Sequence, residues 1–222
     1  GVVAALHLGK AAIATPLLQA DLGVDLAGAG WLTGIFAVLG LLGGAAAGAV
    51  VAAVGDRRAL LLGLGVTAVA GVAGAAAPSF ALLLISRLLE GLGFLLIIVA
   101  GPAILERLTT GAARDSAFSL WSCFMPSGMA LAMVAGPLFQ TWQGLWWTGS
   151  AVAVIAAMAV GCCVPAGVSS GMPGRLLGNI RRVLFSRASV LLAVGFALYS
   201  LMFFALFSFL PVLLMERMDI SY

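Results

Sequence analysis

Four ionisable residues interrupt otherwise apolar stretches of the sequence, and they are the first candidates for chemistry. His7 and Lys10 lie three residues apart near the N-terminus, and Arg87 and Glu90 have the same spacing in a later stretch. Residues three apart share one face of a helix, so the members of each pair can act together. Where such a helix crosses a bilayer, a charge at its centre costs about 2.5–3.5 kcal/mol on insertion scales. These four side chains are therefore expected to face a protein interior or a watery cavity, as candidates for substrate binding or ion coupling.

Two interpretations are open for each pair. Arg87 and Glu90 could form an ion pair within one helix, which lowers the cost of inserting both charges. Alternatively, Arg87 could line a central cavity, where it would contact an anion or tune a proton-accepting Glu90. Lys10 could extend its charge to a membrane interface, or it could face the same cavity. If both cations face a cavity, Glu90 cancels only one positive charge, and the cavity favours anionic or strongly polar substrates.

The composition indicates a polytopic, all-α integral membrane protein. Hydrophobic residues make up 63% of the 222 residues, charged residues only 9%, and the mean hydropathy is +1.20. A soluble domain carries roughly 25% charged residues, so lipid is the solvent that accepts this surface. A spanning helix needs about 20 mostly apolar residues. Seven stretches meet this condition, and they lie at 1–19, 29–53, 59–77, 80–105, 116–139, 145–166 and 188–214.

The charges between these stretches predict the orientation and the domains. Eight of the eleven basic residues follow the second, fourth and sixth stretches, while the other connections hold almost none. The positive-inside rule places that side in the cytoplasm, and with it the N-terminus. Residues 1–166 are expected to form a bundle of six helices, the first of them cut short. Residues 167–187 are expected to be a basic cytoplasmic linker, and residues 188–222 the first helix of an incomplete second bundle.

Several functional classes find no support in the sequence. The three cysteines have no metal-ligand spacing, and the single histidine cannot supply a two-histidine metal site, so neither a metal nor a cofactor is expected. No phosphate-binding GxxxxGK[ST], GxSxG or HExxH motif occurs, which argues against an ATPase and an intramembrane enzyme. The arginines are dispersed between apolar runs, which argues against a nucleic-acid partner. No enzymatic activity is therefore expected.

Two motifs resemble those of a known family. The segment from Gly48 to Gly55-Asp56-Arg57-Arg58 resembles the loop signature G-x-L-A-D-R-x-G-R-R/K of the major facilitator superfamily. Its two glycines match and Arg57 matches the closing basic position, whereas Asp56 takes a position that is Arg in the family. Two alanines replace the family's Asp and the Arg after it, so the cytoplasmic charge lock that this Asp forms in the family is in doubt here unless Asp56 substitutes for it.

A second match lies in the fourth stretch. Arg87-Leu-Leu-Glu90-Gly91-Leu-Gly resembles the family's R-x-x-Q-G-x-G motif, and in the family this Arg is associated with proton coupling or substrate binding. Gly136-Pro137 in the fifth stretch partly resembles the antiporter motif G-P-x-x-G-G, but the final glycine pair is absent, so antiport is not supported. Gly91, Gly136 and Pro137 are therefore expected to serve helix packing. Lys10-x5-Pro16 in the first stretch and Arg87-x-x-Glu90-Gly91 in the fourth look similar to bacterial members of the cyanate/nitroimidazole transporter group.

The resemblance implies the first half, plus one helix, of a twelve-helix transporter that works by alternating access. Helices one, four and seven would line its cavity, and Tyr199, Ser200 and Phe203 are candidates on the seventh. The expected function is secondary transport of a small anionic or drug-like solute, driven by protons, by a monomer in the bacterial inner membrane. The partners are then the solute, protons and the lipid bilayer. A non-transporting membrane receptor or scaffold is the alternative.

Overall fold

The computed structural model describes residues 1–166, together with 186–187, 190–191, 194–195, 198 and 202. These described residues are helical, without a β-strand, and they include six helical segments long and apolar enough to cross a membrane. The prediction of an all-α membrane protein with six spans before residue 167 is therefore confirmed. The chain divides into two compact units, Gly1–Gly171 and Met172–Tyr222.

Seven α-helices and one short 3-10 helix make up the first unit. They are α1 (Val2–Leu22), α2 (Leu26–Val54), α3 (Asp56–Ala75), α4 (Phe80–Leu108), α5 (Gly111–Ser122), α6 (Phe124–Ala135), η1 (Gly136–Leu138) and α7 (Trp142–Cys163). The segment Gly111–Leu138, which contains α5, α6 and η1, counts as one span. Most of the expected seventh helix at 188–214 lies outside the described residues.

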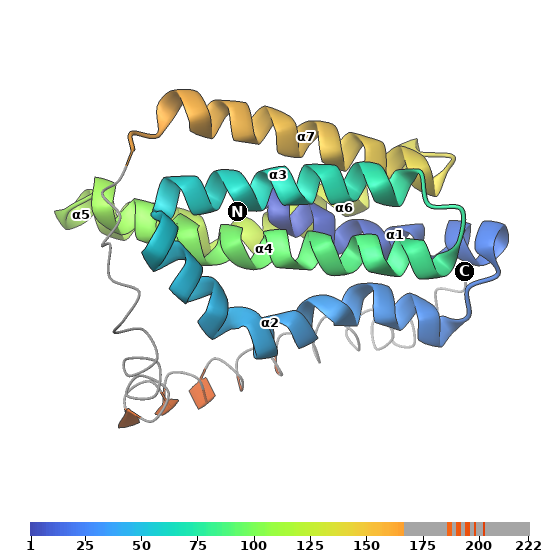
Figure 1. The fold of residues 1–222 in the computed structure, drawn as a ribbon, viewed down its shortest axis with the longest axis horizontal. Helices are drawn as coiled ribbons and strands as arrows, with labels where there is room; N and C mark the ends of the chain where they lie inside the picture. The colour runs from blue at the N-terminus through green and yellow to red at the C-terminus, as the bar shows by residue number, and fades with distance from the viewer. Residues whose placement is uncertain (167–185, 188–189, 192–193, 196–197, 199–201, 203–222) are drawn as a thin grey trace, which may run out of the picture. The chain divides into compact units, whose positions relative to one another are not determined.

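Glycine and aspartate make the connections between helices short. Gly55 alone separates α2 from α3, and its φ of 92° lies in a region that side chains rarely adopt. Gly23 ends α1 in the left-handed conformation, with φ at 63°. Asp25 then caps α2, because its carboxylate accepts a hydrogen bond from the backbone N–H of Gly28 at 2.7 Å. Connections this short make consecutive helices run in opposite directions (Figure 1).

The structure corrects the expected ends of the fourth and fifth spans. The helix α4 continues to Leu108 and α5 begins at Gly111, so Glu106, Arg107 and Arg114 lie on helices and not in a loop. Long charged side chains at a helix end can reach the interface while the backbone stays helical, and a hydropathy pattern therefore underestimates the helix. The fifth span is also interrupted at Cys123, where a continuous helix was expected.

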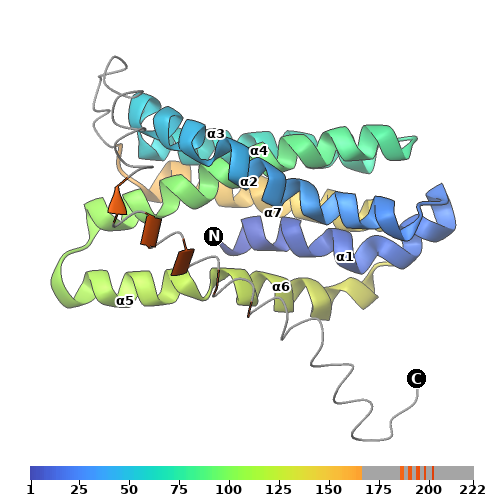
Figure 2. The same ribbon diagram turned by 90° about the horizontal axis from the view of Figure 1, so that it is seen from below.

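The helices lie side by side, with α3 between α4 and α7 and with α2 against α4 (Figure 1). The helix α1 contacts α2, α6 and α7, and a view from below shows α6 beside it (Figure 2). Small residues allow the closest approaches. A Cβ at Gly93 of α4 would lie 2.6 Å from the carbonyl oxygen of Gly63 on α3, so only glycine fits this crossing.

Small residues recur every four positions in two stripes, Gly40-Gly44-Gly48 on α2 and Gly128-Ala132-Gly136 at the end of the fifth span, and the two stripes differ in what they contact. Gly128 and Ala132 of α6 are buried, and a Cβ at Gly128 would lie 2.7 Å from the carbonyl oxygen of Val2 on α1. This stripe is a helix contact, as such spacing predicts. By contrast, a Cβ at Gly44 or Gly48 of α2 would meet no atom within 4 Å, so the α2 stripe contacts no other helix of the described residues.

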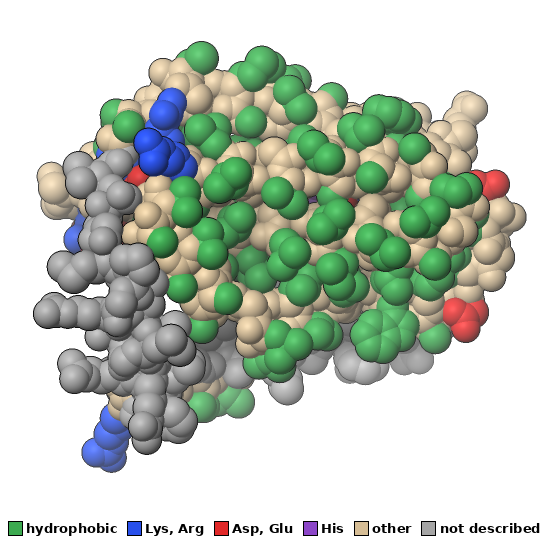
Figure 3. Space-filling model, viewed as in Figure 1, with side chains coloured by type: hydrophobic (Ala, Val, Ile, Leu, Met, Phe, Trp, Pro, Cys, Tyr) green, Lys and Arg blue, Asp and Glu red, His purple; other side chains and the backbone are tan. Residues whose placement is uncertain are grey.

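The surface of the first unit is apolar along the helices and charged at their ends. Large hydrophobic side chains such as Leu41 and Val69 are 86% and 71% exposed, as expected for a surface that faces lipid. Figure 3 shows these side chains over the face formed by α3 and α4, with basic side chains at the end where α3 begins. Acidic side chains appear at the opposite end, where Asp25 starts α2. The two ends of the bundle therefore differ in charge as the connections predicted.

Candidate functional site

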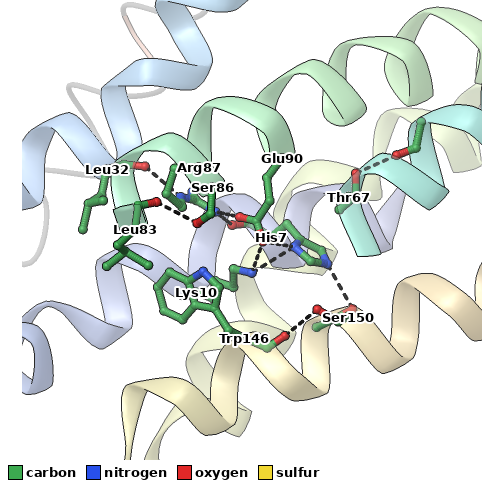
Figure 4. A network of polar contacts seen from close by, with 12 residues as sticks. His7, Lys10, Leu32, Thr67, Leu83, Ser86, Arg87, Glu90, Trp146 and Ser150 are labelled. Carbon is green, nitrogen blue, oxygen red and sulfur yellow. Dashed lines mark hydrogen bonds and ion pairs between the residues drawn. The ribbon is translucent and has the colours of Figure 1, made fainter. Parts of the chain in front are cut away.

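The four ionisable residues singled out in the sequence meet inside the first unit. His7 and Lys10 come from α1, Arg87 and Glu90 from α4, and Figure 4 shows their polar groups pointing toward one another. Each residue is at most 3% exposed. We call these four residues the buried charge cluster. Charges this deep are rare unless they are paired, and in membrane proteins they mark functional positions more often than not.

Glu90 is the centre of the cluster. Its Oε1 lies 2.5 Å from the Nζ of Lys10, and its Oε2 accepts a hydrogen bond from the Nη1 of Arg87, also at 2.5 Å. The intrahelical pair of Arg87 and Glu90, one of the two alternatives from the sequence, is therefore present. It is joined by a second pair that ties α4 to α1. One carboxylate thus serves two cations, so the cluster carries an excess of positive charge when both are protonated.

Arg87 also connects α4 to two other helices. Its Nη1 donates to the backbone oxygen of His7 on α1 at 2.8 Å, and its Nε donates to that of Leu32 on α2 at 3.0 Å. Its guanidinium carbon lies 4.3 Å from the ring centre of Phe36, within the range of a cation–π contact. These contacts hold Arg87 in one orientation at the meeting point of α1, α2 and α4.

The protonation state of His7 decides which neighbour its Nδ1 hydrogen-bonds. Its Nε2 lies 3.0 Å from the carbonyl oxygen of Gly149 on α7, which can only accept, so Nε2 carries a proton. Its Nδ1 lies between two groups, 3.0 Å from the Nζ of Lys10 and 3.2 Å from the Oε1 of Glu90. A neutral His7 accepts from Lys10 at Nδ1, whereas a protonated His7 donates to Glu90 there. The same nitrogen cannot do both.

The helix α7 contributes groups that the sequence reasoning missed. Trp146 is fully buried, and its ring centre lies 4.6 Å from the Nζ of Lys10. Its indole Nε1 has no hydrogen-bond partner among the described residues, and neither has the Nη2 of Arg87. Gly71 of α3 leaves room for the cluster, because a Cβ there would lie 3.1 Å from the Oε1 of Glu90. Trp146 lies near the start of α7, and a tryptophan at this point of the sixth stretch was the signal in the sequence for this contact.

The loop motif lies at the basic end of the bundle, away from the buried charge cluster. Asp56 begins α3 and accepts a hydrogen bond from the Nε of Arg107 on α4 at 2.6 Å. Arg107 also donates to the carbonyl oxygen of Pro165 at 3.2 Å, and Arg57 donates to that of Gly161 on α7 at 2.6 Å. These contacts join the ends of α3, α4 and α7. Arg58 is exposed.

The residues expected to serve packing are placed as follows. A Cβ at Gly91 would meet the Cδ1 of Leu39 on α2, and a Cβ at Gly136 would meet Ile13 on α1. Pro137 lies in η1, where the fifth span ends. Tyr199, Ser200 and Phe203 lie outside the described residues. Within the part of the chain that the structure describes, no three His, Cys, Asp or Glu residues are grouped as a metal site requires.

Comparison with known proteins identifies the family to which the chain is similar. The model of the Major Facilitator Superfamily matches residues 2–222. The 3-(3-hydroxy-phenyl)propionate transporter of Escherichia coli (strain K12) is 30% identical over 230 aligned residues, which cover 96% of this chain and 54% of that protein. The puromycin resistance protein pur8 of Streptomyces alboniger is 30% identical over 181 residues, or 75% of this chain and 35% of that protein.

A solved structure shares the fold. A crystal structure of the peptide transporter POT in complex with sulfate matches with a TM-score of 0.61 and 20% identity, over 93% of this chain and 44% of that one. The chain therefore spans about half, or less, of the length of the proteins it resembles. Six apolar spans, the two motifs in their expected places and a family match along nearly the whole sequence agree: this chain belongs to the Major Facilitator Superfamily of membrane transporters.

Proposed function

We propose that this chain forms part of a secondary active transporter, which moves a small solute across the bacterial inner membrane by alternating access and is driven by protons. The family supports the transport class, and the named E. coli relative is a transporter. The basic end of the bundle would face the cytoplasm by the positive-inside rule. The N-terminus then lies on the cytoplasmic side, because α1 starts at the same end as α3.

The observation that carries the coupling proposal is the position of the Nδ1 of His7 between Lys10 and Glu90. Histidine is the side chain whose unperturbed proton affinity lies nearest physiological pH. A proton that arrives at Nδ1 converts an acceptor for Lys10 into a donor for Glu90. Lys10 then loses one of its two acceptors in the cluster. Proton arrival thus changes the contacts between helices without a change in covalent structure.

The change at His7 would reach three other helices. Its backbone oxygen accepts from Arg87 on α4, its Nε2 bonds the backbone of α7 at Gly149, and Arg87 in turn bonds α2 at Leu32. A ligand or proton shifts a conformational equilibrium only through a difference in its contacts with the two states. The protonated and unprotonated clusters supply such a difference at the point where α1, α2, α4 and α7 meet.

The substrate we propose is an aromatic anion, with a drug-like aromatic compound as the second choice. The name of the E. coli relative specifies an aromatic carboxylate, and that of the Streptomyces relative specifies resistance to puromycin. The buried charge cluster has more cationic than anionic groups, and this excess favours a negative solute nearby through the long-range field. In this proposal the buried charge cluster acts on the substrate through its field and does not bind it directly.

The proposal is tested by uptake into proteoliposomes that contain the full-length protein. 3-(3-Hydroxyphenyl)propionate and puromycin are each supplied with and without an imposed pH gradient. His7→Asn keeps a donor for the Gly149 oxygen but cannot take a second proton, so we expect accumulation driven by the pH gradient to be lost while exchange of solute persists. Arg87→Ala should abolish both. Arg114→Gln, which alters an exposed pair with Glu106, is the control and should transport normally. Unchanged accumulation in both cluster variants would refute the coupling role.

A further inference from the structure

An apolar groove runs along the outside of α3 in the first unit. It has a volume of about 770 Å³, and its lining includes Arg58, Leu62, Gly65, Val69 and Leu89. The lining also includes Val54 at the end of α2, so the groove lies where α2, α3 and α4 meet the surface. Leu62 and Val69 are 50% and 71% exposed. The groove is therefore open to the lipid that surrounds this apolar face.

The groove has one charged end. Arg58 lies in the first turn of α3, and α3 begins at the basic end of the bundle. Its neighbours Arg57 and Arg107 are engaged with Gly161 and Asp56. Arg58 is exposed and has neither a hydrogen bond nor an ion pair to any residue that the structure describes. Its five N–H donors are thus available to an anion at the mouth of an otherwise apolar groove.

The length of the groove fits one leaflet of a bilayer. Arg58 and Val69 are eleven residues apart on the same helix, and at about 1.5 Å per residue this corresponds to roughly 16 Å. The hydrocarbon core of a bilayer is about 30 Å thick, so one leaflet is roughly 15 Å. Gly65 has no side chain to fill the groove, and a Cβ there would meet no atom within 4 Å. An extended acyl chain could therefore lie over Gly65 with its headgroup at Arg58.

We propose that this groove binds an anionic phospholipid from the leaflet on the basic side of the bundle. The headgroup phosphate pairs with the guanidinium of Arg58, whose planar donors match phosphate oxygens. One acyl chain lies along Leu62, Gly65 and Val69. An apolar helix from another protein would cover the same side chains but would leave Arg58 without a counter-charge. A phospholipid satisfies both ends of the groove, and it is present wherever the protein is.

The proposal is tested by native mass spectrometry of the full-length protein released from detergent. The protein is incubated with phosphatidylglycerol or phosphatidylcholine, and the bound lipids are counted. We expect the wild type to retain phosphatidylglycerol in preference. Arg58→Gln should weaken that binding by about five-fold, the factor one arginine contributes near an anionic surface. Gly65→Leu, which fills the floor of the groove, should weaken binding of both lipids. Arg58→Lys should retain most of the preference.

Two matched variants serve as controls. Arg114→Gln removes a basic residue at the same end but outside the groove, and Gly161→Leu adds the same side chain at another open position on α7. Both should bind lipid as the wild type does. The proposal is overturned if Arg58→Gln leaves the preference for phosphatidylglycerol intact, if Gly65→Leu does not reduce binding, or if the controls lose as much. Equal competition by glycerol phosphate, which has no acyl chain, would also overturn it.

Discussion

Replacing Glu90 with glutamine in the full-length protein should destabilise the fold strongly. The carboxylate is fully buried and lies 2.5 Å from the nitrogens of both Lys10 and Arg87. Glutamine has nearly the same size and keeps one oxygen acceptor, so the change removes charge and little else. Two buried cations are then left without a counter-charge. Breaking a buried ion pair by removing one partner costs about 3–5 kcal/mol, and this is the loss in unfolding free energy that we expect.

A second variant separates the charge effect from a loss of packing. Lys10→Met removes one of the two cations, so the double variant Lys10→Met/Glu90→Gln buries only one unpaired charge, that of Arg87. It should be more stable than the sum of the two single effects predicts. Residues in direct contact give coupling energies of about 0.5–3 kcal/mol in such cycles, and the short contact between Lys10 and Glu90 favours the upper part of this range.

The measurement is unfolding in mixed detergent micelles, followed by the fluorescence of the five tryptophans in the sequence. Glu106→Gln is the control, because it removes the same charge from an ion pair with Arg114 that is largely exposed. Exposed pairs contribute at most about 1 kcal/mol, so the control should be close to the wild type. A loss of less than about 1 kcal/mol for Glu90→Gln, or strictly additive effects in the cycle, would refute the paired cluster.

Three further predictions concern the framework around the site. Gly93→Ala should cost about 1–3 kcal/mol of stability, because its Cβ would lie 2.6 Å from a backbone oxygen of α3. Gly65→Ala, at an open position, should be neutral or slightly stabilising. Melting curves of the two purified variants compare these effects. Gly55→Ala should lower the melting temperature, because φ is 92° and ψ is 148° there, a region essentially restricted to glycine that costs other residues about 1–3 kcal/mol; an unchanged melting temperature would contradict this requirement for glycine. Asp56→Asn should weaken the pair with Arg107 by at most about 1 kcal/mol while it slows transport, if this pair replaces the family's cytoplasmic lock; transport at the normal rate would contradict that role.

The sequence predicted the members of the buried charge cluster because they are rare. His7, Lys10, Arg87 and Glu90 are conspicuous in apolar stretches, and their spacing placed each pair on one helix face. The contact between Lys10 and Glu90 could not be predicted, because it joins residues 80 positions apart and depends on how α1 packs against α4. The contact between Trp146 and Lys10 also depends on how helices pack. It was missed because a tryptophan in a span also suits a lipid-facing position.

The number and order of the described spans were predictable from the sequence, but their ends were not. Glu106 and Arg107 belong to the last turn of α4 although they look like loop residues. Backbone hydrogen bonding continues the helix past the apolar stretch, which hydropathy alone does not register. Likewise, hydropathy does not register the interruption at Cys123, although the sequence marks it: Pro126 has no backbone N–H to bond the carbonyl of Ser122 four residues earlier.

Proton movement during transport is the direct test of proton coupling through His7. The full-length protein is placed in vesicles that enclose a pH-sensitive dye, and 3-(3-hydroxyphenyl)propionate is added outside without an imposed gradient. The account predicts that the vesicle interior acidifies with substrate entry in the wild type and that His7→Asn abolishes this acidification while substrate still equilibrates. Substrate entry with no change in internal pH in the wild type, or the same acidification in His7→Asn, would contradict it.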